Sequence, residues 1–503
     1  MLKKIPAWAA PAIVCILLIC LYGFTASTRL TWANNGSDGG DLVAAVLSGG
    51  IPHPTGYPTY MILSLLLQRL PLGDAYFRIV LLSFFPAALA AGFFAAWVNS
   101  FHPGSRLPGA IAGLLWGMSS LLWSQSVIVE VYGLQALFTV LGLWWTTLLL
   151  RTFSQRPIIL MVLAIIFGTA LGNHATTLIL LPACLVGMVY WAKNTGRFKL
   201  TFIQLGAVVL GGLVYIYLPI QASSYPPVNW GNPQTIDGFL WEVTGYPYQA
   251  LFGGASLYHV VERIMAAAVI LRQQVGLLGI ALGIIGAYQF HQFNRKVSWA
   301  CFWIFFSTLA FSIGYNTADS TAYLNPAVMV YCGWIGFSIV ALNSQKWRQV
   351  PIQPLVSLLL IILLLIQIPA TLDQIDPQEG YFAADFAEKA FSQLPENAIV
   401  VTSSDLDSFP LWAYQFGFGL RNDLAIIVHP LTQFEWYQQT LYRIYPALKY
   451  PVTTKLEADD TMWIDQIGLL NPNRVMCKSA ITHKIKIAIN FDCSDGKMIA
   501  IRP

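Results

Sequence analysis

Apolar runs of about twenty residues recur through the first 370 positions of this chain, and they constrain its fold more than any other feature. A helix of that length crosses about 30 Å of hydrocarbon. The whole chain is 56% hydrophobic and only 10% charged, whereas soluble domains carry about 25% charged residues. We therefore predict an α-helical multi-pass membrane domain over residues 1–370.

The apolar runs predict about eleven membrane spans. The predicted spans are residues 6–24, 76–98, 107–123, 133–150, 157–172, 176–192, 200–219, 274–290, 298–314, 326–343 and 352–370. The first run follows two lysines, as a signal peptide does, but we find no persuasive cleavage site of small residues after it. We therefore interpret it as a span.

The charge balance changes after residue 370. Residues 371–503 contain 16 acidic and 11 basic side chains, a net −5, whereas residues 1–370 contain 8 acidic and 17 basic side chains, a net +9. The later segment also alternates helical and extended patterns. Residues 380–394, 409–418 and 433–445 have a helical pattern, and residues 398–402 and 424–428 an extended one. We predict that residues 371–503 form a C-terminal soluble α/β domain.

Basic residues predict the orientation in the membrane. Twelve of the 17 Lys and Arg residues in the membrane part fall in loops on one side, and the side richer in Lys and Arg is cytoplasmic. The N-terminus is therefore predicted to be cytoplasmic, and eleven crossings put the C-terminal domain on the extracytoplasmic face. All eight acidic residues of the membrane part then share that outer face. They are Asp38, Asp41, Asp74, Glu130, Asp237, Glu242, Glu262 and Asp319.

Two further observations bear on partners and on the environment. The excess basic residues lie in the membrane part, where orientation explains them, so the pI near 8.6 indicates no nucleic-acid partner. In the outer domain, an oxidising exterior would let Cys477 and Cys493 pair. Two free thiols are equally compatible with the sequence, because connectivity cannot be deduced from spacing.

The first outer loop contains four candidate functional residues. Asp38 and Asp41 flank a glycine pair, and a carboxylate at the membrane surface can take a proton from an attacking hydroxyl. The plain alternative is that Asp38 caps the helix that follows. His53 and Tyr57 lie in a rigid segment with three prolines, where they offer donors to a phosphate or sugar oxygen. The alternative there is a stiff turn without a function.

Later outer loops supply the other candidates. Glu130 interrupts an apolar stretch, and an ionisable group at that depth is a functional candidate by default, although it could also be an interfacial residue that reaches water. His174 lies at an outer turn, where a structural role is the common alternative. Asn229 and Trp230 are typical of sugar binding and equally of a membrane interface. Candidate phosphate-binding cations and the acid of the last loop complete the set: Arg78, Arg263, Arg272 and Asp319.

The C-terminal domain contains one pair of acids with the spacing of a metal-binding motif. Asp405 and Asp407 are separated by one residue. They also fall at a predicted turn from strand to helix, where acidic residues cap helices. We therefore interpret the pair as capping residues and predict no metal site.

The loops, in this order, resemble a family of multi-span glycosyltransferases of the GT-C superfamily, which includes the enzyme that O-mannosylates plexin and related receptor ectodomains and also has bacterial homologues. The family pattern Asp-Ser-Gly-Glu appears here as residues 38–41, Asp-Gly-Gly-Asp, and its His-Pro-Pro-Gly-Tyr-Pro pattern as residues 53–58, His-Pro-Thr-Gly-Tyr-Pro. The stretches around residues 123–132, 173–174, 229–233 and 405–412 are also similar. The aspartate at position 41 and the threonine at position 55 depart from the pattern, so a catalytic role of Asp41 is less certain than that of Asp38.

The resemblance implies a GT-C-like fold and a glycosyltransferase that uses a polyprenyl-phosphate sugar, with a hexose such as mannose. Transfer would occur with inversion at the extracytoplasmic face, with Asp38 as general base and Asp41 as a second catalytic candidate. The acceptor would be a protein, a glycan or a lipid. No cofactor beyond the lipid-linked sugar is expected, and the bacterial homologues suggest a bacterial plasma membrane.

Two other classes of function stay open at this point. A transporter or flippase of a lipid-linked glycan would also be a multi-span protein, but such proteins place charged sites near the bilayer midplane, often within repeats. This chain has no clear repeat, and its acids lie in outer loops. A non-catalytic scaffold whose C-terminal domain binds a partner is the third class.

Overall fold

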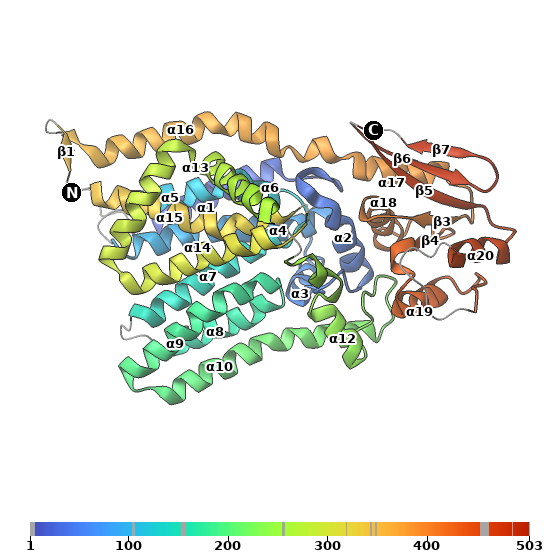
Figure 1. Ribbon diagram of the computed structural model, residues 1–503, viewed down its shortest axis with the longest axis horizontal. Coiled ribbons are helices and arrows are strands. Elements are labelled where there is room, and N and C mark those ends of the chain that lie inside the picture. The colour runs from blue at the N-terminus through green and yellow to red at the C-terminus, as the bar shows by residue number, and fades with distance from the viewer. Residues whose placement is uncertain are drawn as a thin grey trace.

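The computed structural model describes residues 6–102, 106–151, 157–253, 257–317, 319–342, 345–347, 350–452, 462–484 and 486–501. A bundle of long helices makes up most of the molecule, and the C-terminal part lies beyond one end of that bundle (Figure 1). Helices α2 (Gly39–Ser48), α3 (Pro58–Leu67) and α12 (Ile236–Val243) lie between the two. The segment that contains α2 and α3 therefore lies between the helical bundle and the C-terminal part.

The bundle consists of helices whose sequences are almost wholly apolar. Its members are α1 (Ala9–Thr25), α4 (Ala75–Asn99), α5 (Leu107–Gly117), α6 (Ser120–Ser126), α7 (Tyr132–Arg151), α8 (Pro157–Leu171), α9 (Leu181–Thr195), α10 (Phe198–Gly212), α13 (Leu257–Phe293), α14 (Arg295–Gly314), α15 (Asn325–Ala341) and α16 (Ile352–Ile375). Shorter helices connect them: η1 (Ala33–Asp38), η2 (Ala175–Leu180), η3 (Leu213–Ile216), α11 (Tyr217–Ala222), η4 (Tyr246–Leu251) and η5 (Ser320–Leu324). A two-stranded hairpin of β1 (Lys346–Trp347) and β2 (Val350–Pro351) precedes α16.

Every predicted span coincides with a helix or with a bent pair of helices. Within the described residues, eight helices are long and apolar enough to cross a membrane, and α5 and α6 form a ninth candidate that bends by 63°. The other two predicted spans are α1 and α8, which have 17 and 15 residues. The multi-pass helical fold is confirmed, and the number of crossings is approximate.

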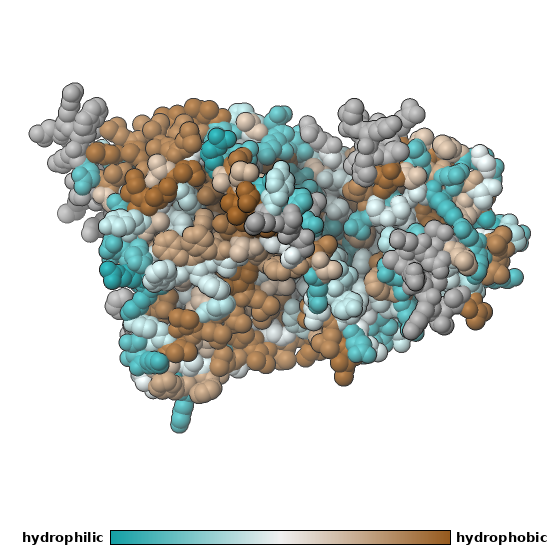
Figure 2. All heavy atoms as spheres, viewed as in Figure 1, coloured by the Kyte–Doolittle hydropathy of each residue, from teal (hydrophilic) through white to brown (hydrophobic). Residues whose placement is uncertain are grey.

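The surface of the bundle is apolar where a bilayer would cover it. In Figure 2, hydrophobic side chains cover the flanks of the helical part, and hydrophilic residues gather at its far end and over the C-terminal part. Large apolar side chains on the outside of the bundle are exposed, among them Phe24, Phe202 and Leu277. An exposed apolar surface of this kind marks contact with lipid.

The C-terminal part packs helices against a five-stranded sheet. Its helices are η7 (Pro377–Gly380), α17 (Phe382–Gln393), α18 (Asp405–Trp412), η8 (Ala413–Gly417), η9 (His429–Leu431), α19 (Glu435–Ile444) and α20 (Met462–Leu470), and its strands are β3 (Ile399–Thr402), β4 (Ala425–Val428), β5 (Met476–Lys484), β6 (Lys486–Cys493) and β7 (Met498–Ile501). The strand order is β4-β3-β5-β6-β7, with β3 parallel to both β4 and β5, and β5, β6 and β7 antiparallel. The predicted α/β character is confirmed, whereas the sequence patterns missed β5, β6 and β7.

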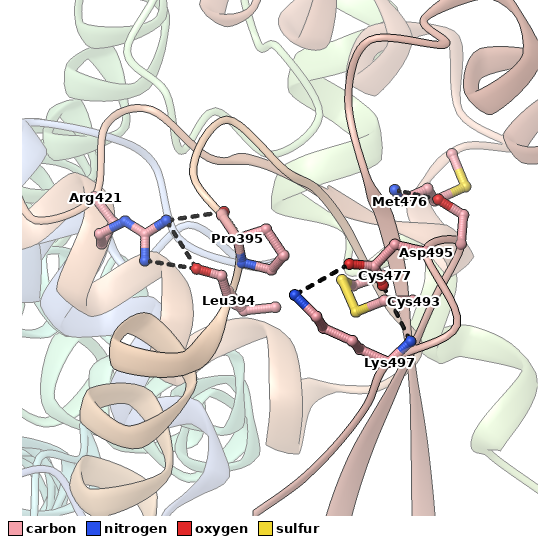
Figure 3. The surroundings of a disulfide bond; sticks show 9 residues. Leu394, Pro395, Arg421, Met476, Cys477, Cys493, Asp495 and Lys497 are labelled. Atoms are coloured by element: carbon pink, nitrogen blue, oxygen red, sulfur yellow. Dashed lines mark hydrogen bonds and ion pairs between the residues drawn. A yellow bond between two sulfur atoms is a disulfide. The ribbon is translucent and has the colours of Figure 1, made fainter.

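A disulfide joins two neighbouring strands of this sheet. Cys477 on β5 and Cys493 on β6 are opposite each other in the strand register and are bonded (Figure 3). Close by, Lys497 pairs with Asp495, and Arg421 donates to the carbonyls of Leu394 and Pro395. The pairing that the sequence left open is therefore present in the structure.

The first outer loop holds the C-terminal part in place. Arg29 forms ion pairs of 2.9 Å with both Asp385 and Glu388 on α17, although such half-exposed pairs contribute at most about 1 kcal/mol each. The closer contact is steric. A Cβ at Gly40 would lie only 2.6 Å from the carbonyl carbon and oxygen of Phe409 on α18. Glycine at this position is what lets α2 and α18 approach backbone to backbone.

We expect Gly40→Ala to loosen the C-terminal part, because the added methyl group would force α2 and α18 apart at a cost of about 1–3 kcal/mol. The thermal unfolding midpoint should fall, and limited proteolysis should cleave the C-terminal part faster than in the wild type. Gly212→Ala is a matched control, because no atom lies within 4 Å of a Cβ at that position. Equal stability and equal cleavage rates in the two variants would contradict the contact.

Candidate active site

Asp41 is a fully buried carboxylate near the start of α2. It accepts three N–H groups. Its Oδ2 lies 2.8 Å from the backbone nitrogen of His53 and 2.8 Å from Nδ1 of the same residue, and its Oδ1 lies 3.1 Å from Nε1 of Trp230. Because the carboxylate is an acceptor, it favours the His53 ring with a hydrogen on Nδ1. Asp41 therefore orients His53 and has no atom open to a substrate.

The opposite side of the His53 ring faces Asp38. Its Nε2 lies 3.5 Å from Oδ2 of Asp38 and 3.0 Å from the hydroxyl of Tyr57. Burial alone would lower the pKa of His53, but Asp38 and Asp41 outweigh it and raise the pKa to about 9. His53 is thus a cation at neutral pH, held between two acids.

Asp38 is the acid of this group that reaches solvent, with 37% of its side chain exposed. It occupies the residue before α2, yet its side chain accepts no hydrogen bond from that helix. Its recorded hydrogen bond comes from the Ser37 hydroxyl at 3.2 Å. The interpretation of Asp38 as a helix cap is therefore wrong, and the carboxylate is available to a ligand.

Protein surroundings raise the pKa of Asp38 above its ordinary value. Withdrawal from water is the main cause, Asp319 and Asp41 add to it, and the charge of His53 works in the opposite direction. A carboxylate with a raised pKa holds a proton more tightly and is therefore a stronger base. The geometry and the charge both suit Asp38 to proton removal.

Asp319, His174 and Glu130 lie on the other side of Asp38. Asp319 accepts hydrogen bonds from the hydroxyls of Tyr132 at 3.0 Å and Tyr323 at 3.4 Å. His174 lies among aromatic rings, with ring-centre distances of 5.5 Å to Tyr132 and 5.8 Å to Tyr323. Two loops and the start of α7 thus meet at one place.

Burial disfavours the charged forms of both Glu130 and His174. Burial, with the nearby charges of Asp38 and Asp319, raises the pKa of Glu130 well above its ordinary value. Burial lowers the pKa of His174 to about 4. His174 also accepts a hydrogen bond from the backbone of Thr176, which gives it a structural role at the start of η2.

Aromatic residues form the wall on the side of the C-terminal part. The indole of Trp230 packs against Phe409, Trp412 and Trp436, with ring centres 5.8 to 6.4 Å apart. Phe409 also stacks on His53, with ring centres 6.5 Å apart. The neighbouring Asn229 is buried and donates to Asn232, while its side-chain oxygen has no partner. The predicted pair Asn229 and Trp230 is therefore inside the site and not at a lipid interface.

In the part of the chain that the structure describes, none of the three candidate arginines has a recorded ion pair with the acids of this group. Arg78 donates to Gln68 and to the carbonyls of Leu72 and Gly73, and so fixes the turn before α4. Arg263 donates to the carbonyls of Ile313 and Tyr315 and to Asn316. Arg272 is exposed on α13, and the structure records no polar partner for it in the part of the chain that it describes. The guanidinium groups of Arg78 and Arg263 are thus committed to backbone carbonyls.

Some residues of the site were absent from the candidates chosen from the sequence. Four of them lie near candidate residues in the sequence, which was the signal that could have found them. They are Tyr132 near Glu130, Tyr323 near Asp319, and Phe409 and Trp412 near Asp405. Glu242 gave a weaker signal, as an acid that follows Phe239 and Trp241 on α12. It is fully buried, both of its carboxyl oxygens lack partners, and burial with the charge of Asp41 raises its pKa well above the ordinary value.

The pair Asp405 and Asp407 divides into two different roles. Asp407 is fully buried, and with Ser404 it forms a capping box at the start of α18. The capping interpretation is confirmed for Asp407, which accepts the backbone N–H groups of Ser403 and Ser404. Asp405 takes no part in that cap. In the described ranges, no group of three or more His, Cys, Asp or Glu residues is arranged to hold a metal ion.

A cleft in the bundle begins beside Asp319 and continues into the membrane region. It is a narrow cleft of about 30 Å³ between α7, η2, α14, η5 and α15. Its walls are mostly apolar, and Tyr132 and Tyr323, which hold Asp319, line its outer end. Deeper residues of the wall include Ala136, Ile179 and Ile304. The site therefore combines an acidic, solvent-accessible end with an apolar extension.

A helical membrane bundle with an acidic site at one end, joined to a C-terminal α/β part, defines the GT-C class of fold. The chain is similar to the crystal structure of ArnT from Cupriavidus metallidurans bound to undecaprenyl phosphate, with a TM-score of 0.57 over 93% of this chain and 92% of that chain, at 11% identity. The apo structure of the same protein gives a TM-score of 0.56. The GT-C fold predicted from the sequence is confirmed.

Within that class, the chain is similar to the TMEM260 proteins. A sequence model described as the protein O-mannosyl-transferase TMEM260 N-terminal domain matches residues 38–197, and one described as TMEM260-associated domain 2 matches residues 383–484. Protein O-mannosyl-transferase TMEM260 of Mus musculus is 24% identical over 83% of this chain, and the protein of the same name in Dictyostelium discoideum is 23% identical over 87%. The predicted resemblance is confirmed.

The chain spans 62% and 60% of the lengths of these two relatives. Both relatives are eukaryotic, so they give no support to the bacterial plasma membrane that the sequence suggested. Their activity is therefore brought to this chain only as a proposal.

His53 gives the folded protein a characteristic pH dependence. Its pKa of about 9 exceeds the ordinary value of 6.5, so its bound proton stabilises the folded state fully below about pH 6.5, and this stabilisation is lost as the pH rises through about 9. We expect the unfolding midpoint in detergent to fall across this range by more in the wild type than in His53→Gln. His259→Gln, at an exposed histidine, should behave as the wild type. Identical pH profiles for wild type and His53→Gln would contradict the raised pKa.

Proposed function

We propose that this protein is a membrane glycosyltransferase that moves a hexose, mannose by analogy with its relatives, from a polyprenyl phosphate to a hydroxyl of a protein acceptor. The observation that carries the proposal is the position of Asp38. This half-exposed carboxylate has no structural partner on α2 and lies beside a histidine cation. It is also close enough to Asp319 to be affected by its charge, and the tyrosines that hold Asp319 line the outer end of an apolar cleft. The names of the relatives and the likeness to a protein that binds undecaprenyl phosphate support the same function.

In the proposed reaction Asp38 removes the proton from the acceptor hydroxyl. The acceptor oxygen then attacks the anomeric carbon of the sugar, and the bond from that carbon to the phosphate oxygen breaks. The electron pair of that bond leaves with the lipid phosphate. Because a single displacement from the opposite face forms the new bond, the configuration at the anomeric carbon inverts.

The leaving phosphate needs positive charge or hydrogen-bond donors near it. His53 is the cation closest to Asp38 in the described structure, at 3.5 Å, and the exposed Arg272 is the arginine of the predicted set whose guanidinium has no recorded partner. The hydroxyls of Tyr132 and Tyr323 donate to Asp319 in this structure, so they would have to turn away from it to reach a phosphate. With these groups available, we assign no cofactor other than the lipid-linked sugar.

The acidic pocket belongs on the extracytoplasmic side in this proposal. The distribution of Lys and Arg gives that orientation. The bonded pair Cys477 and Cys493 supports it, because disulfides persist in oxidising compartments. The acceptor would then reach Asp38 from outside the membrane, between the outer loops and the C-terminal part.

We expect Asp38→Asn to lower the rate of transfer by about 10²- to 10⁴-fold, because the amide cannot accept the acceptor proton. The measurement is transfer of labelled mannose from polyprenyl-phosphate mannose to a peptide rich in serine and threonine, in proteoliposomes. Asp237→Asn is a matched control, since Asp237 is an exposed acid of the same outer face. Near-normal transfer by Asp38→Asn would refute the role of Asp38.

The apolar cleft is proposed to widen from its volume of about 30 Å³ and to hold the first units of the lipid chain. Ala136→Phe should then raise KM for the long-chain donor by roughly tenfold, because the added ring fills space that the chain occupies, and should change kcat little. Gly206→Phe is the control, because no atom lies within 4 Å of a Cβ at that position. An unchanged KM for Ala136→Phe would remove the cleft from the donor site.

A further inference from the structure

A second and larger cavity lies between α1 and α4, away from the proposed catalytic pocket. Its volume of about 520 Å³ is within the range of cavities that hold a ligand. Near its start, α4 touches the catalytic region, where Ser83 donates to the backbone carbonyl of Glu130 at 3.0 Å. Asn99, which lines the cavity, is 16 residues further along the helix, or about 24 Å. The cavity therefore opens toward the opposite end of the bundle, and the proposed reaction uses none of its residues.

The cavity is a groove along one face of each helix. Its close approach point is Gly92, where a Cβ would clash with the sulfur of Cys15 and lie 2.9 Å from the carbonyl oxygen of Pro11. Small side chains on both helices then leave room beside this contact. The wall residues are spaced three or four apart, which puts them on one face of each helix, and they include Trp8, Ala12 and Cys15 on α1 and Leu89, Gly92 and Ala96 on α4.

The length of the groove matches one leaflet of a bilayer. From Leu89 to Asn99 the helix α4 advances by ten residues, which is about 15 Å. The hydrocarbon core of a bilayer is about 30 Å thick. Trp8 lines the end of the groove and is 69% exposed, as is typical of a tryptophan at the level of the lipid headgroups. The groove thus has the length of an acyl chain that belongs to one leaflet.

The polar end of the groove is formed by Asn99, Ser100 and Arg106. Asn99 is buried, and its side chain donates to the carbonyl of Arg106 at 3.2 Å and accepts from the backbone nitrogen of Gly109 at 3.1 Å. These two hydrogen bonds fix the backbone of Arg106 at the end of the groove. Within the described part of the chain, the guanidinium of Arg106 has no recorded hydrogen bond or ion pair.

The surroundings of Arg106 supply no counter-ion from the helices that form the groove. The sequence contains no acidic residue from position 1 to 37 or from position 75 to 129, and these ranges include α1, α4 and α5. A second cation is close by, because Arg151 lies over the ring of Phe101 at 4.9 Å. An arginine without a partner beside an apolar groove is complementary to a phosphate that carries an acyl chain, since a guanidinium binds phosphate oxygens in pairs.

We propose that this groove binds an anionic phospholipid, with one acyl chain between α1 and α4 and the phosphate against the guanidinium of Arg106. The lipid belongs to the leaflet opposite the catalytic pocket, which the distribution of Lys and Arg predicts to be cytoplasmic. Basic pockets between membrane helices on that side bind anionic headgroups in this way. The site is separate from the proposed reaction, and its occupant is a bound lipid that joins α1 to α4.

The test measures the binding of dioleoylphosphatidylglycerol, which is anionic, and dioleoylphosphatidylcholine, which is zwitterionic, to the purified full chain in detergent by native mass spectrometry. The wild type should bind the anionic lipid more tightly. Arg106→Gln should weaken binding of the anionic lipid roughly fivefold and leave binding of the zwitterionic lipid unchanged, because one cation near the headgroup is lost. Ala96→Phe should weaken binding of both lipids, because the added ring fills the groove.

Arg197→Gln and Val209→Phe are the matched controls. The first changes an exposed arginine on the same predicted side, and the second adds a ring at a residue of α10 that is 68% exposed. Both should bind the two lipids as the wild type does, and the unfolding midpoint without added lipid should show that Arg106→Gln is folded.

Equal affinity of the wild type for the two lipids, or unchanged binding of the anionic lipid by Arg106→Gln, would overturn the proposal. Undecaprenyl phosphate is the third probe, because it carries a phosphate on a chain longer than one leaflet. If it binds more tightly than dioleoylphosphatidylglycerol, and Ala96→Phe abolishes that binding, the groove is a polyprenyl-phosphate site and the assignment to a phospholipid is wrong.

Discussion

The buried carboxylate of Asp41 is the interaction on which the site depends. It joins three segments that are distant in the sequence, because it belongs to α2 and accepts N–H groups from the turn at His53 and from the indole of Trp230. A buried carboxylate is costly unless donors surround it, so each segment has one favourable position relative to the others. Asp41 also affects the surroundings of Asp38, because it fixes one nitrogen of the His53 ring. The other nitrogen of that ring lies 3.5 Å from Asp38. Asp41 therefore acts on the pocket without being exposed to it.

The one-sided distribution of acidic residues in the membrane part has a structural explanation. Asp38, Asp41, Glu130 and Asp319 converge on one pocket, as their mutual electrostatic interactions show, and Glu242 lies close enough to Asp41 to be affected by its charge. Asp74 has a purely local role as the cap of α4. Like charges so close together raise the pKa values of Asp38 and Glu130, and the charge of His53 works in the opposite direction.

Much of this fold could be predicted from the sequence, because an apolar run of about twenty residues is typical of a membrane-spanning helix and of little else. The candidate residues of the outer loops were also visible as polar interruptions, and His53, Tyr57, Trp230 and Asp319 do lie together. Their roles were not visible, since Asp38 and Asp41 look equivalent in the sequence, and only packing shows that one is sealed and the other open. Arg78 and Arg263 donate to backbone carbonyls, and the positions of those carbonyls cannot be predicted from the spacing of residues in the sequence. The strands β5, β6 and β7 contain many charged and polar residues, so their alternation of apolar and polar positions is hard to see in the sequence. The position of α18 depends on a contact between residues that are about 370 positions apart.

The approach of Gly40 to Phe409 has a consequence for biogenesis. Gly40 and Phe409 come from the first tenth of the chain and from its last fifth. During synthesis, the helices can enter the bilayer and the loop can reach its place long before α18 has left the ribosome. The pocket is then still open on one side, and it closes only when the C-terminal part has folded and docked. Synthesis of the last fifth of the polypeptide is thus a precondition for a closed pocket, which separates membrane insertion of the helices from completion of the site.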